Sequence, residues 1–280
     1  MTWLVIGARG QLGTDLMRVM GNRAVGLDVP EIDITDPSSV TSAMRDIVPE
    51  VVINCAAYTA VDAAEADETT AMAINGNGVA IIATACPDAR LVHISTDYVF
   101  DGTSTAPYAE EATPAPRSAY GRTKLAGERA ALSHPHPYVL RTAWLYGAHG
   151  QNFVKTMLHL ERTRETVSVV DDQVGQPTWS VDLARQIDML VQSDAPGGIY
   201  HATNSGSASW YEFARHIFAG VGADPGRVLS TTTAQFPRPA PRPASSVLGH
   251  SRWAQVGLTP MRPWEEALAE ALPVILTSPH

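Results

Sequence analysis

The stretch Trp3-Leu4-Val5-Ile6-Gly7-Ala8-Arg9-Gly10-Gln11-Leu12-Gly13 decides the fold. Its first four residues are continuously apolar, as in a strand that is buried on both faces, and three regularly spaced glycines follow at once. From Gln11 to Met20 the apolar residues recur at helical spacing. A strand that passes through a glycine-rich turn into a helix is typical of dinucleotide-binding folds, where backbone N–H groups and the positive helix end meet a pyrophosphate. A turn that merely needs small residues is the alternative.

Further apolar runs follow this unit, and helical patterns separate them. Continuously apolar strands that alternate with helices are typical of a parallel sheet with helices on both faces. We therefore predict an α/β fold, a Rossmann-type doubly wound parallel sheet with a smaller mixed α/β substrate-binding lobe. The predicted strands are Leu4–Ile6, Val25–Asp28, Val51–Ala57, Leu91–Ile94 and Tyr138–Arg141, and the helices are Gln11–Met20, Pro37–Ile47 after an Asp36 cap, Glu65–Ala85, and Ser118 as a cap through Leu132.

The second half of the chain is less regular. Strictly alternating units give way to mixed ones near Gly147, so we predict a dinucleotide-binding domain over residues 1–147. Residues 148–280 are predicted to form mainly a substrate-binding lobe, with some chain returning to the first domain. Helical patterns cover Phe153–Arg162, Val181–Val191, Trp210–Val221 and Trp264–Leu272, and extended ones cover Val167–Val170 and Ile199–His201.

The composition restricts the possible partners. The chain has 280 residues, a net charge of −9 and a pI of about 5.4, which argues against nucleic acid or an anionic membrane as a partner. No apolar run reaches the roughly 18 residues of a membrane span. The chain starts directly on a strand, so we expect no signal peptide and a cytoplasmic location. Neither Cys55 nor Cys86 lies in a CxxC pair, and the histidines lack metal-ligand spacing, so no metal is predicted.

Tyr120 and Lys124 carry the predicted chemistry. They lie four residues apart at the start of a predicted helix and therefore share one helix face. A phenol has a pKa of about 10, and a neighbouring ammonium favours the phenolate and lowers that pKa. We expect Tyr120 to act as a general acid near neutral pH, with Lys124 beside it. Thr96, at the carboxyl end of a strand, is expected to bind the same carbonyl oxygen, although a lone Thr-Asp is usually a turn.

Two charged residues give conflicting indications about the cofactor. Asp28 ends the second strand, at the spacing from Gly7 where an acidic residue holds a ribose 2′-hydroxyl and favours NADH. Arg9, inside the glycine-rich loop, would instead meet the 2′-phosphate of NADPH. A surface acid is the alternative for Asp28, and Asp33-Ile34 are candidates to flank the adenine. The sequence therefore predicts NADPH or NADH, with both used.

The carboxyl edge of the sheet carries further candidate contacts. Ala56-Ala57-Tyr58 ends the third strand, where small side chains would let a cofactor lie close. Ordinary tight packing of strand on helix is the alternative explanation for the alanines. Tyr98 and Trp144 lie near the same edge and would pack on a sugar or base, or else in the core.

These motifs resemble those of the extended short-chain dehydrogenase/reductases, and within that group the dTDP-4-dehydrorhamnose reductase family. The resemblance runs nearly end to end. It rests on the segments Gly10–Gly13 (GQLG), Asn54–Asp62 (NCAAYTAVD), Ser95–Gly102 (STDYVFDG), Tyr120–Glu128 (YGRTKLAGE), Arg141–Gly147 (RTAWLYG), Asp172–Thr178 (DQVGQPT) and Arg242-Pro243.

The resemblance implies NAD(P)H-dependent reduction of the C4 ketone of a dTDP-4-keto-6-deoxyhexose, such as dTDP-4-dehydro-L-rhamnose. By position it makes Thr96, Tyr120 and Lys124 the catalytic residues. The sugar would be bound by Val61, Thr96, Asp97, Tyr98 and Trp144. The cofactor would be bound by Gly10, Gln11, Leu12, Asp33, Ile34, Ala57, Tyr58, Thr59, Tyr120 and Lys124. The pattern of the glycine-rich loop and of the strand ends adds Gly7, Arg9, Gly13, Asp28 and Ala56 as further candidates for the cofactor.

The Pro-rich segment Phe236–Pro243 is expected to be a loop on the substrate side. Consecutive X-Pro steps forbid a helix, so the segment must be extended. An acidic protein needs a local basic patch to bind an anion, so Arg238, Arg242 and Lys155 are candidates to bind the diphosphate of the substrate. A solvated connector is the alternative.

The sequence also departs from the family pattern. Some members use glutamates to hold magnesium at a dimer contact, and here those positions are Asp15 and Ser180. We therefore expect a monomer or a homodimer without metal. The segment Ala244–Leu248 is looser than is usual in the family, so the product sugar can differ. Two alternatives stay open: a nucleotide-sugar epimerase or dehydratase, and a non-catalytic regulatory subunit on the same scaffold.

Overall fold

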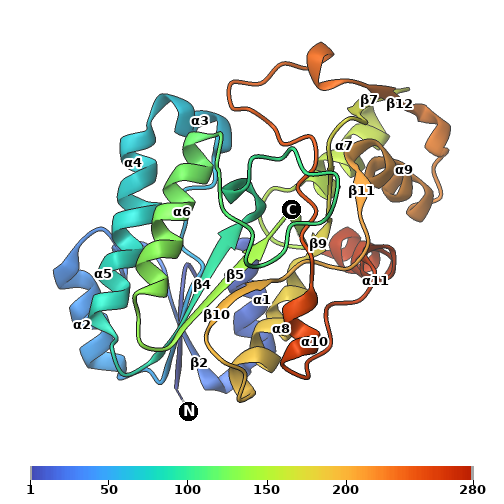
Figure 1. Cartoon of the computed structure of the whole chain (residues 1–280). Helices are drawn as coiled ribbons and strands as arrows, with labels where there is room; N and C mark the ends of the chain where they lie inside the picture. The colour runs from blue at the N-terminus through green and yellow to red at the C-terminus, as the bar shows by residue number, and fades with distance from the viewer. Residues whose placement is uncertain (1, 279–280) are drawn as a thin grey trace.

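A six-stranded parallel sheet is the centre of the molecule (Figure 1). This computed structural model describes residues 2–278. The strand order is β10-β5-β4-β3-β1-β2, so the order reverses beside β1, and ligands of such sheets bind at the carboxyl ends of the strands there. The predicted α/β fold is confirmed. The strands are β1 (Trp3–Ile6), β2 (Ala24–Leu27), β3 (Val51–Asn54), β4 (Arg90–Thr96), β5 (Pro137–Thr142) and β10 (Gly198–His201).

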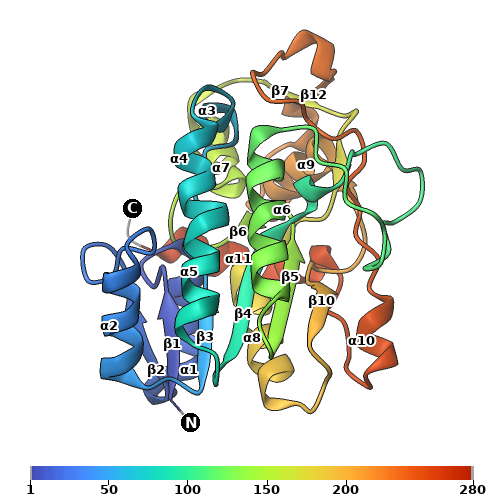
Figure 2. The ribbon, with the colours of Figure 1, turned by 60° about the vertical axis from the view of Figure 1, so that its left-hand side comes forward.

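Helices cover both faces of this sheet because successive strand residues point to opposite sides (Figure 2). In β1, Trp3 and Val5 pack with α1 (Gln11–Met20) and α8 (Ser180–Gln192). Leu4 and Ile6 pack on the other face. That face is covered by α2 (Pro37–Ile47), α5 (Gly78–Ala85) and α6 (Ala119–Leu132).

Two predicted helix starts are confirmed by their caps. The Asp36 carboxylate accepts a hydrogen bond from the Ser38 N–H at 2.8 Å, and Pro37 is the first residue of α2. The Ser118 hydroxyl accepts one from the Gly121 N–H at 3.0 Å and starts α6. The second cap matters for function, because it fixes where Tyr120 lies on the first turn.

The predicted continuous helix Glu65–Ala85 is wrong. The chain forms α3 (Val61–Ala66), α4 (Glu68–Met72), a π-helical turn at Ala73–Asn77, and then α5. The Asp67 carboxylate accepts a hydrogen bond from the Thr70 N–H at 3.0 Å, which starts a new helix at that point. The third strand is also shorter than predicted: it ends at Asn54, whose side chain accepts the Ala56 N–H at 3.1 Å.

A second hydrophobic cluster lies apart from the sheet. It unites α7 (Phe153–Thr163), α9 (Trp210–Gly220) and α11 (Trp264–Thr277), the last longer than predicted. The remaining strands are β6 (Leu145–Tyr146), β7 (Val167–Val170), β8 (Val174–Gly175), β9 (Thr178–Trp179), β11 (Ala208–Ser209) and β12 (Val228–Thr231), paired as β6-β9, β7-β12 and β8-β11, and a short helix α10 covers Ser251–Gln255.

The second half of the chain also contributes to the first region. Strand β10 pairs in parallel with β5, and α8 packs against α1. The division at residue 147 stays a prediction. Over residues 2–278, no helix combines the length and apolar character that a membrane crossing requires.

Candidate active site

One cavity of about 590 Å³ opens at the carboxyl edge of the sheet. Segments far apart in the sequence meet there: the glycine-rich loop, the ends of β3 and β4, helix α6, and the chain after β5. Of the predicted site residues it is lined by Gly7, Gly10, Gln11, Leu12, Gly13, Ala57, Thr59, Val61, Thr96, Asp97, Tyr98, Tyr120, Lys124 and Trp144, and further by Cys55, Gln151 and Trp210.

Two glycines of the glycine-rich loop have no room for a side chain. Gly7 has a φ of +80°, and a Cβ there would lie 2.7 Å from the Ala56 nitrogen. A Cβ on Gly13 would lie 2.1 Å from the Gly7 carbonyl oxygen. Gly10, the N-cap of α1, has no side-chain hydrogen bond, and the first turn carries no acidic residue. The open N-terminus of α1 therefore fits the pyrophosphate of a dinucleotide.

The side chains of Asp28 and Arg9 both have hydrogen-bond partners within the chain. The Asp28 carboxylate accepts hydrogen bonds from the N–H groups of Arg9 at 2.8 Å and Val29 at 2.9 Å. The Arg9 guanidinium donates to the Val29 carbonyl at 2.7 Å and pairs with Glu31. The pairing with Arg9 holds the pKa of the Glu31 carboxyl below its usual range. Neither cofactor is therefore favoured by a free charge at these two positions.

Asp33 and Ile34 lie outside the cavity lining. The Asp33 carboxylate accepts from the Thr35 N–H at 2.8 Å and the Thr35 hydroxyl at 2.7 Å. Ile34 is buried in the core beneath Gly78, where a Cβ would come within 2.9 Å of its side chain. Their proposed contact with adenine stays a prediction.

Asn75 holds the chain after β3 in place, and the sequence reasoning missed it. Its side chain accepts from the Tyr58 N–H at 2.8 Å and donates to the Tyr58 carbonyl at 3.0 Å. It also donates to the Thr123 hydroxyl of α6 at 3.1 Å. Asn75 is fully buried in the π-helical turn. A π-helical turn often marks a functional site, but the sequence signal is only a polar residue inside an Ala-rich helix.

Lys124 lies where the helix pattern predicted, but its ammonium makes a different contact. It is 2% exposed, and the ammonium donates to the Ile94 carbonyl at 2.6 Å. Burial lowers the pKa of Lys124 to about 8, against an opposing contribution from Glu128. Burial raises the pKa of Tyr120, and the Thr96 hydroxyl opposes that rise. The prediction that Lys124 lowers the pKa of Tyr120 is therefore wrong, because desolvation dominates.

Thr96 and Asp97 form a buried polar pair at the end of β4. The Thr96 hydroxyl donates to Asp97 Oδ1 at 3.0 Å and accepts from the Tyr98 N–H at 3.2 Å. Asp97 Oδ2 is buried and makes no hydrogen bond of good geometry in the described chain, although the nearby Ser246 hydroxyl acts to lower the pKa of Asp97. Burial raises the pKa of Asp97 to about 6. The Tyr98 ring meets the Tyr120 ring edge-on, with 5.6 Å between centroids.

A buried ion pair between Glu128 and Arg141 links helix α6 to the strands that end at the cavity. The sequence did not predict this pair. The Glu128 carboxylate accepts two hydrogen bonds from Arg141, each at 2.8 Å, and one from the Ser95 hydroxyl at 2.6 Å. Both charged side chains are 1% exposed. Each residue lies in a motif that the sequence analysis quoted, but nothing in the local pattern pairs them.

The arginines of the Pro-rich segment converge on one carboxylate. Asp62, one residue after Val61 in the cavity wall, accepts from Arg238 at 2.6 Å and from Arg242 at 2.9 Å. Arg242 is 15% exposed and lines a small hollow with Tyr98, whereas Arg238 is 48% exposed. Lys155 lines a separate hollow on α7, so the structure does not bring it together with the arginines.

Asp15 and Ser180 are paired with each other. The Ser180 hydroxyl donates to the Asp15 carboxylate at 2.5 Å, and both side chains are buried. In the part of the chain that the structure describes, no group of three or more His, Cys, Asp or Glu side chains is arranged to hold a metal ion.

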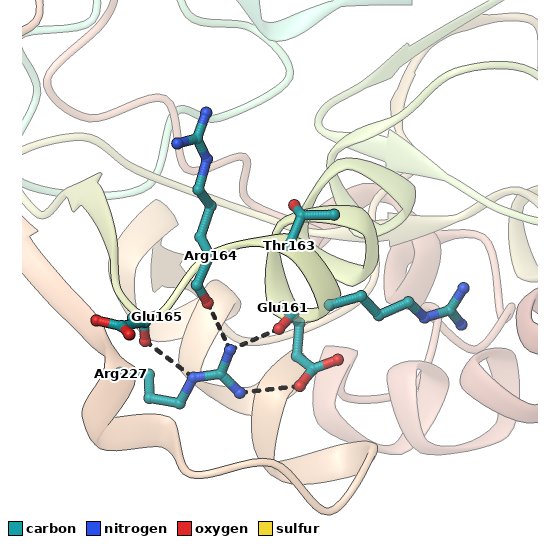
Figure 3. Close-up of a pocket in the computed structure, with 6 residues that line it drawn as sticks. Glu161, Thr163, Arg164, Glu165 and Arg227 are labelled. Atoms are coloured by element: carbon teal, nitrogen blue, oxygen red, sulfur yellow. Dashed lines mark hydrogen bonds and ion pairs between the residues drawn. The ribbon is translucent and has the colours of Figure 1, made fainter.

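Another hollow, of about 470 Å³, has a structural explanation (Figure 3). Arg227 lies in it and donates to the carbonyls of Glu161, Arg164 and Glu165 at 2.5, 2.7 and 3.0 Å. It also donates to the Glu161 carboxylate at 2.9 Å. The guanidinium therefore binds the free carbonyls at the end of α7 and is not available to a ligand.

Comparisons with known proteins agree with this architecture. The family model described as the RmlD substrate binding domain matches residues 1–276. A Streptomyces antibioticus protein described as a probable dTDP-4,6-dihydroxy-2-methyloxan-3-one 4-ketoreductase is 50% identical over 289 aligned positions, which cover 100% of this chain and 97% of that protein. A Streptomyces niveus protein described as dTDP-4-keto-6-deoxy-D-glucose reductase is 49% identical, with 98% and 97% covered.

A solved structure extends the similarity to three dimensions. The crystal structure of dTDP-4-dehydrorhamnose reductase from Bacillus anthracis, in complex with NADP, has a TM-score of 0.94 to this chain at 39% identity. The match covers 98% of this chain and 100% of that one. With its fold, its motifs and its family match in agreement, the chain belongs to the dTDP-4-dehydrorhamnose reductase family.

Proposed function

We propose that this protein reduces the C4 ketone of a dTDP-4-keto-6-deoxyhexose with NADPH or NADH. The observation that carries the proposal is the single cavity that joins the glycine-rich loop to Thr96, Tyr120 and Lys124. The named activities of the two Streptomyces relatives, both ketoreductases of dTDP-linked sugars, support it. The leading substrate is dTDP-4-dehydro-L-rhamnose or a related deoxysugar.

Each residue of the constellation has a distinct task in this proposal. The nicotinamide, when bound, supplies a hydride to C4. Burial keeps the Tyr120 phenol protonated, so it gives its proton to the forming alkoxide as a general acid. The Thr96 hydroxyl, which donates to Asp97 in the structure, turns from that carboxylate and donates its hydrogen bond to the substrate oxygen instead. Lys124, charged at neutral pH, anchors the nicotinamide ribose.

The remaining predicted contacts belong to the same proposal. The substrate is bound by Val61, Asp97, Tyr98 and Trp144 of the first domain and by Arg242 of the lobe drawn mainly from residues 148–280. The protein acts in the cytoplasm as a monomer or homodimer, without nucleic acid or membrane. The cofactor is held by Gly7, Arg9, Gly10, Gln11, Leu12, Gly13, Asp28, Asp33, Ile34, Ala56, Ala57, Tyr58 and Thr59, together with Tyr120 and Lys124.

The test is turnover of a small panel of dTDP-4-keto-6-deoxyhexoses with NADH and NADPH, followed by NMR of the product. We expect steady consumption of the reduced cofactor and a product with a new hydroxyl at C4. Conversion of a dTDP-sugar without net consumption would instead indicate an epimerase or dehydratase. No conversion by a folded, cofactor-binding protein would contradict the proposal.

A further inference from the structure

Two tryptophans in the cavity wall differ from the others in the chain. Of the six tryptophans, Trp3, Trp179, Trp253 and Trp264 are at most 2% exposed and belong to the core. Trp144 and Trp210 are only partly buried, and both line the cavity. Their rings stack with 3.5 Å between centroids and 9° between planes. The stacked pair thus packs against the second hydrophobic cluster and also faces the cavity.

Trp144 has a strained backbone. Its φ is +45°, in the left-handed region that bulky residues rarely adopt, and such strain is concentrated at functional sites. The surrounding structure must therefore hold it. Its carbonyl accepts the Thr178 N–H at 3.2 Å, and its ring lies so close to Gly175 that a Cβ there would be 2.5 Å from the ring. Gly175 leaves the space that the ring occupies.

Trp210 is fixed by the start of its own helix and by a neighbouring aromatic ring of α7. It is the first residue of α9, directly after Ser209, which forms a capping box with Glu212. The Ser209 hydroxyl donates to Asp171 at 2.5 Å. The Phe153 ring of α7 contacts Trp210 with 4.5 Å between centroids. Trp210 therefore belongs to a rigid helix start and can determine where the Trp144 ring lies.

We propose that Trp210 and Gly175 are positioning residues that hold the Trp144 indole as a platform for the hexose of the nucleotide sugar. This inference rests on the proposed function. A hexose has C–H faces that pack on aromatic rings and a polar rim of hydroxyls. A platform fixed in the same cavity as Thr96 and Tyr120 orients the sugar so that its C4 oxygen meets both hydroxyls. The nucleotide part of the ligand is not affected by this platform.

Binding of two probes tests the proposal directly. Calorimetry with dTDP-L-rhamnose and with dTDP, at saturating NADPH, separates the sugar from the nucleotide. We expect Trp210→Ala to weaken dTDP-L-rhamnose binding roughly three- to tenfold, the size of one aromatic contact, with dTDP binding unchanged. Trp210→Phe, which keeps an aromatic ring, should retain most of the affinity. Equal losses for both probes, or no loss in folded Trp210→Ala, would overturn the inference.

Gly175→Ala perturbs the Trp144 ring directly, without changing Trp210. The added methyl group must displace the Trp144 indole, so sugar-dependent affinity and kcat/KM for the keto sugar should fall while the KM for NADPH stays unchanged. In a Trp144→Ala background, Gly175→Ala and Trp210→Ala should have almost no further effect. An undiminished effect in that background would show that neither residue acts through Trp144. Failure of the wild-type protein to reduce any panel sugar, with probe binding as expected, would reject only the proposed function.

Discussion

Helix α6 carries two buried charged side chains, and they differ in the number and kind of their hydrogen-bond partners. Glu128, in its interior, pairs with Arg141 through two 2.8 Å hydrogen bonds and takes a third from Ser95. Lys124, one turn nearer the cavity, donates to a single backbone carbonyl, Ile94. Asp97, in the same cavity wall, has one buried carboxylate oxygen without a well-formed hydrogen bond in the described chain, and the Ser246 hydroxyl lies near it.

The difference separates structural charge from reactive charge. A buried pair whose hydrogen bonds are complete holds β4, β5 and α6 in register and has no reason to exchange protons. Burial displaces the pKa values of Lys124 and Asp97 beside the cavity, and groups with displaced pKa values concentrate at functional sites. Substitutions in the two places should therefore damage different properties.

Tyr120→Phe should have the largest effect, and only on catalysis. We expect kcat to fall by roughly 10²–10⁴-fold, the usual contribution of a general acid, with the thermal midpoint and NADPH affinity retained. Tyr98→Phe is the matched control, because it removes a neighbouring phenol in the same cavity. Because Tyr98→Phe removes at most one neutral hydrogen bond, we expect its kcat to fall by no more than about tenfold. Near-wild-type kcat in Tyr120→Phe would refute the assigned role.

Glu128→Gln should damage stability instead. It leaves the Arg141 guanidinium buried without a counter-charge, which costs about 3–5 kcal/mol of unfolding free energy. Urea denaturation measures this loss. Glu68→Gln is the control: it breaks the exposed pair between Glu68 of α4 and Arg122 of α6 and should cost less than about 1 kcal/mol. Equal costs for the two variants would erase the contrast between buried and exposed pairs.

Asp97→Asn should make the folded protein more stable at neutral pH. The pKa of Asp97 is raised to about 6 in the folded state, so the folded protein holds this proton more strongly than the unfolded chain. The stability that the proton supplies is therefore lost as pH rises from about 4 through 6, by up to about 3 kcal/mol. The neutral Asn avoids that loss.

Unfolding by urea at pH 4.5, 6 and 7.5 would show this. At pH 7.5 the free energy of unfolding of Asp97→Asn should be about 1–3 kcal/mol higher than that of the wild type, and this difference should be smaller at pH 4.5. Asp36→Asn is the control. Hydrogen bonds with Ser38 lower the pKa of the Asp36 carboxyl, so this substitution should not raise the free energy of unfolding at neutral pH. A gap for Asp97→Asn that does not change with pH would contradict the burial of its charge.

Arg242→Ala tests a half-buried charge. If its guanidinium binds the diphosphate, the KM for the nucleotide sugar should rise roughly tenfold to a hundredfold, as for one lost charge-assisted hydrogen bond, with NADPH affinity unchanged. Arg238→Ala, at a more exposed position on the same Asp62, should have a smaller effect. An unchanged KM in Arg242→Ala would favour the solvated connector.

Arg9→Ala should have the smallest effect, because this exposed guanidinium already pairs with Glu31. We expect the thermal midpoint to stay the same and kcat/KM with NADPH to fall by about tenfold or less. Asp28→Ala is the matching change for NADH. Measured at one pH and salt concentration, the wild-type preference between the two cofactors should stay below roughly a thousandfold. A larger preference would show that a single residue decides the choice.

The helix period and the caps were readable because they depend on neighbours in the sequence. Asp36 and Ser118 cap helices within their own turns, and the glycine-rich loop follows from adjacent residues. The break at Asp67 was missed although it is also local, because an Asp within an Ala-rich helical run is compatible with both a continuous helix and a new cap.

The site was predictable to the extent that its residues come from motifs at strand ends. Asn75, Trp210 and the Glu128–Arg141 pair were not assigned roles, because their partners lie on other elements. The i, i+4 spacing placed Lys124 on the face of Tyr120 but did not show that its ammonium would reach the Ile94 carbonyl of β4.

The parallel sheet, the glycine-rich loop and the helix that carries Tyr120 and Lys124 follow from the amino-acid sequence alone, because hydrophobic period, glycines and caps act over a few residues. The direction of the pKa shifts in the cavity, and the partners of its buried charges, depend on the tertiary structure instead. Burial and long-range contacts control both, and they exist only once β4, β5, α6 and α9 have been brought around one cavity.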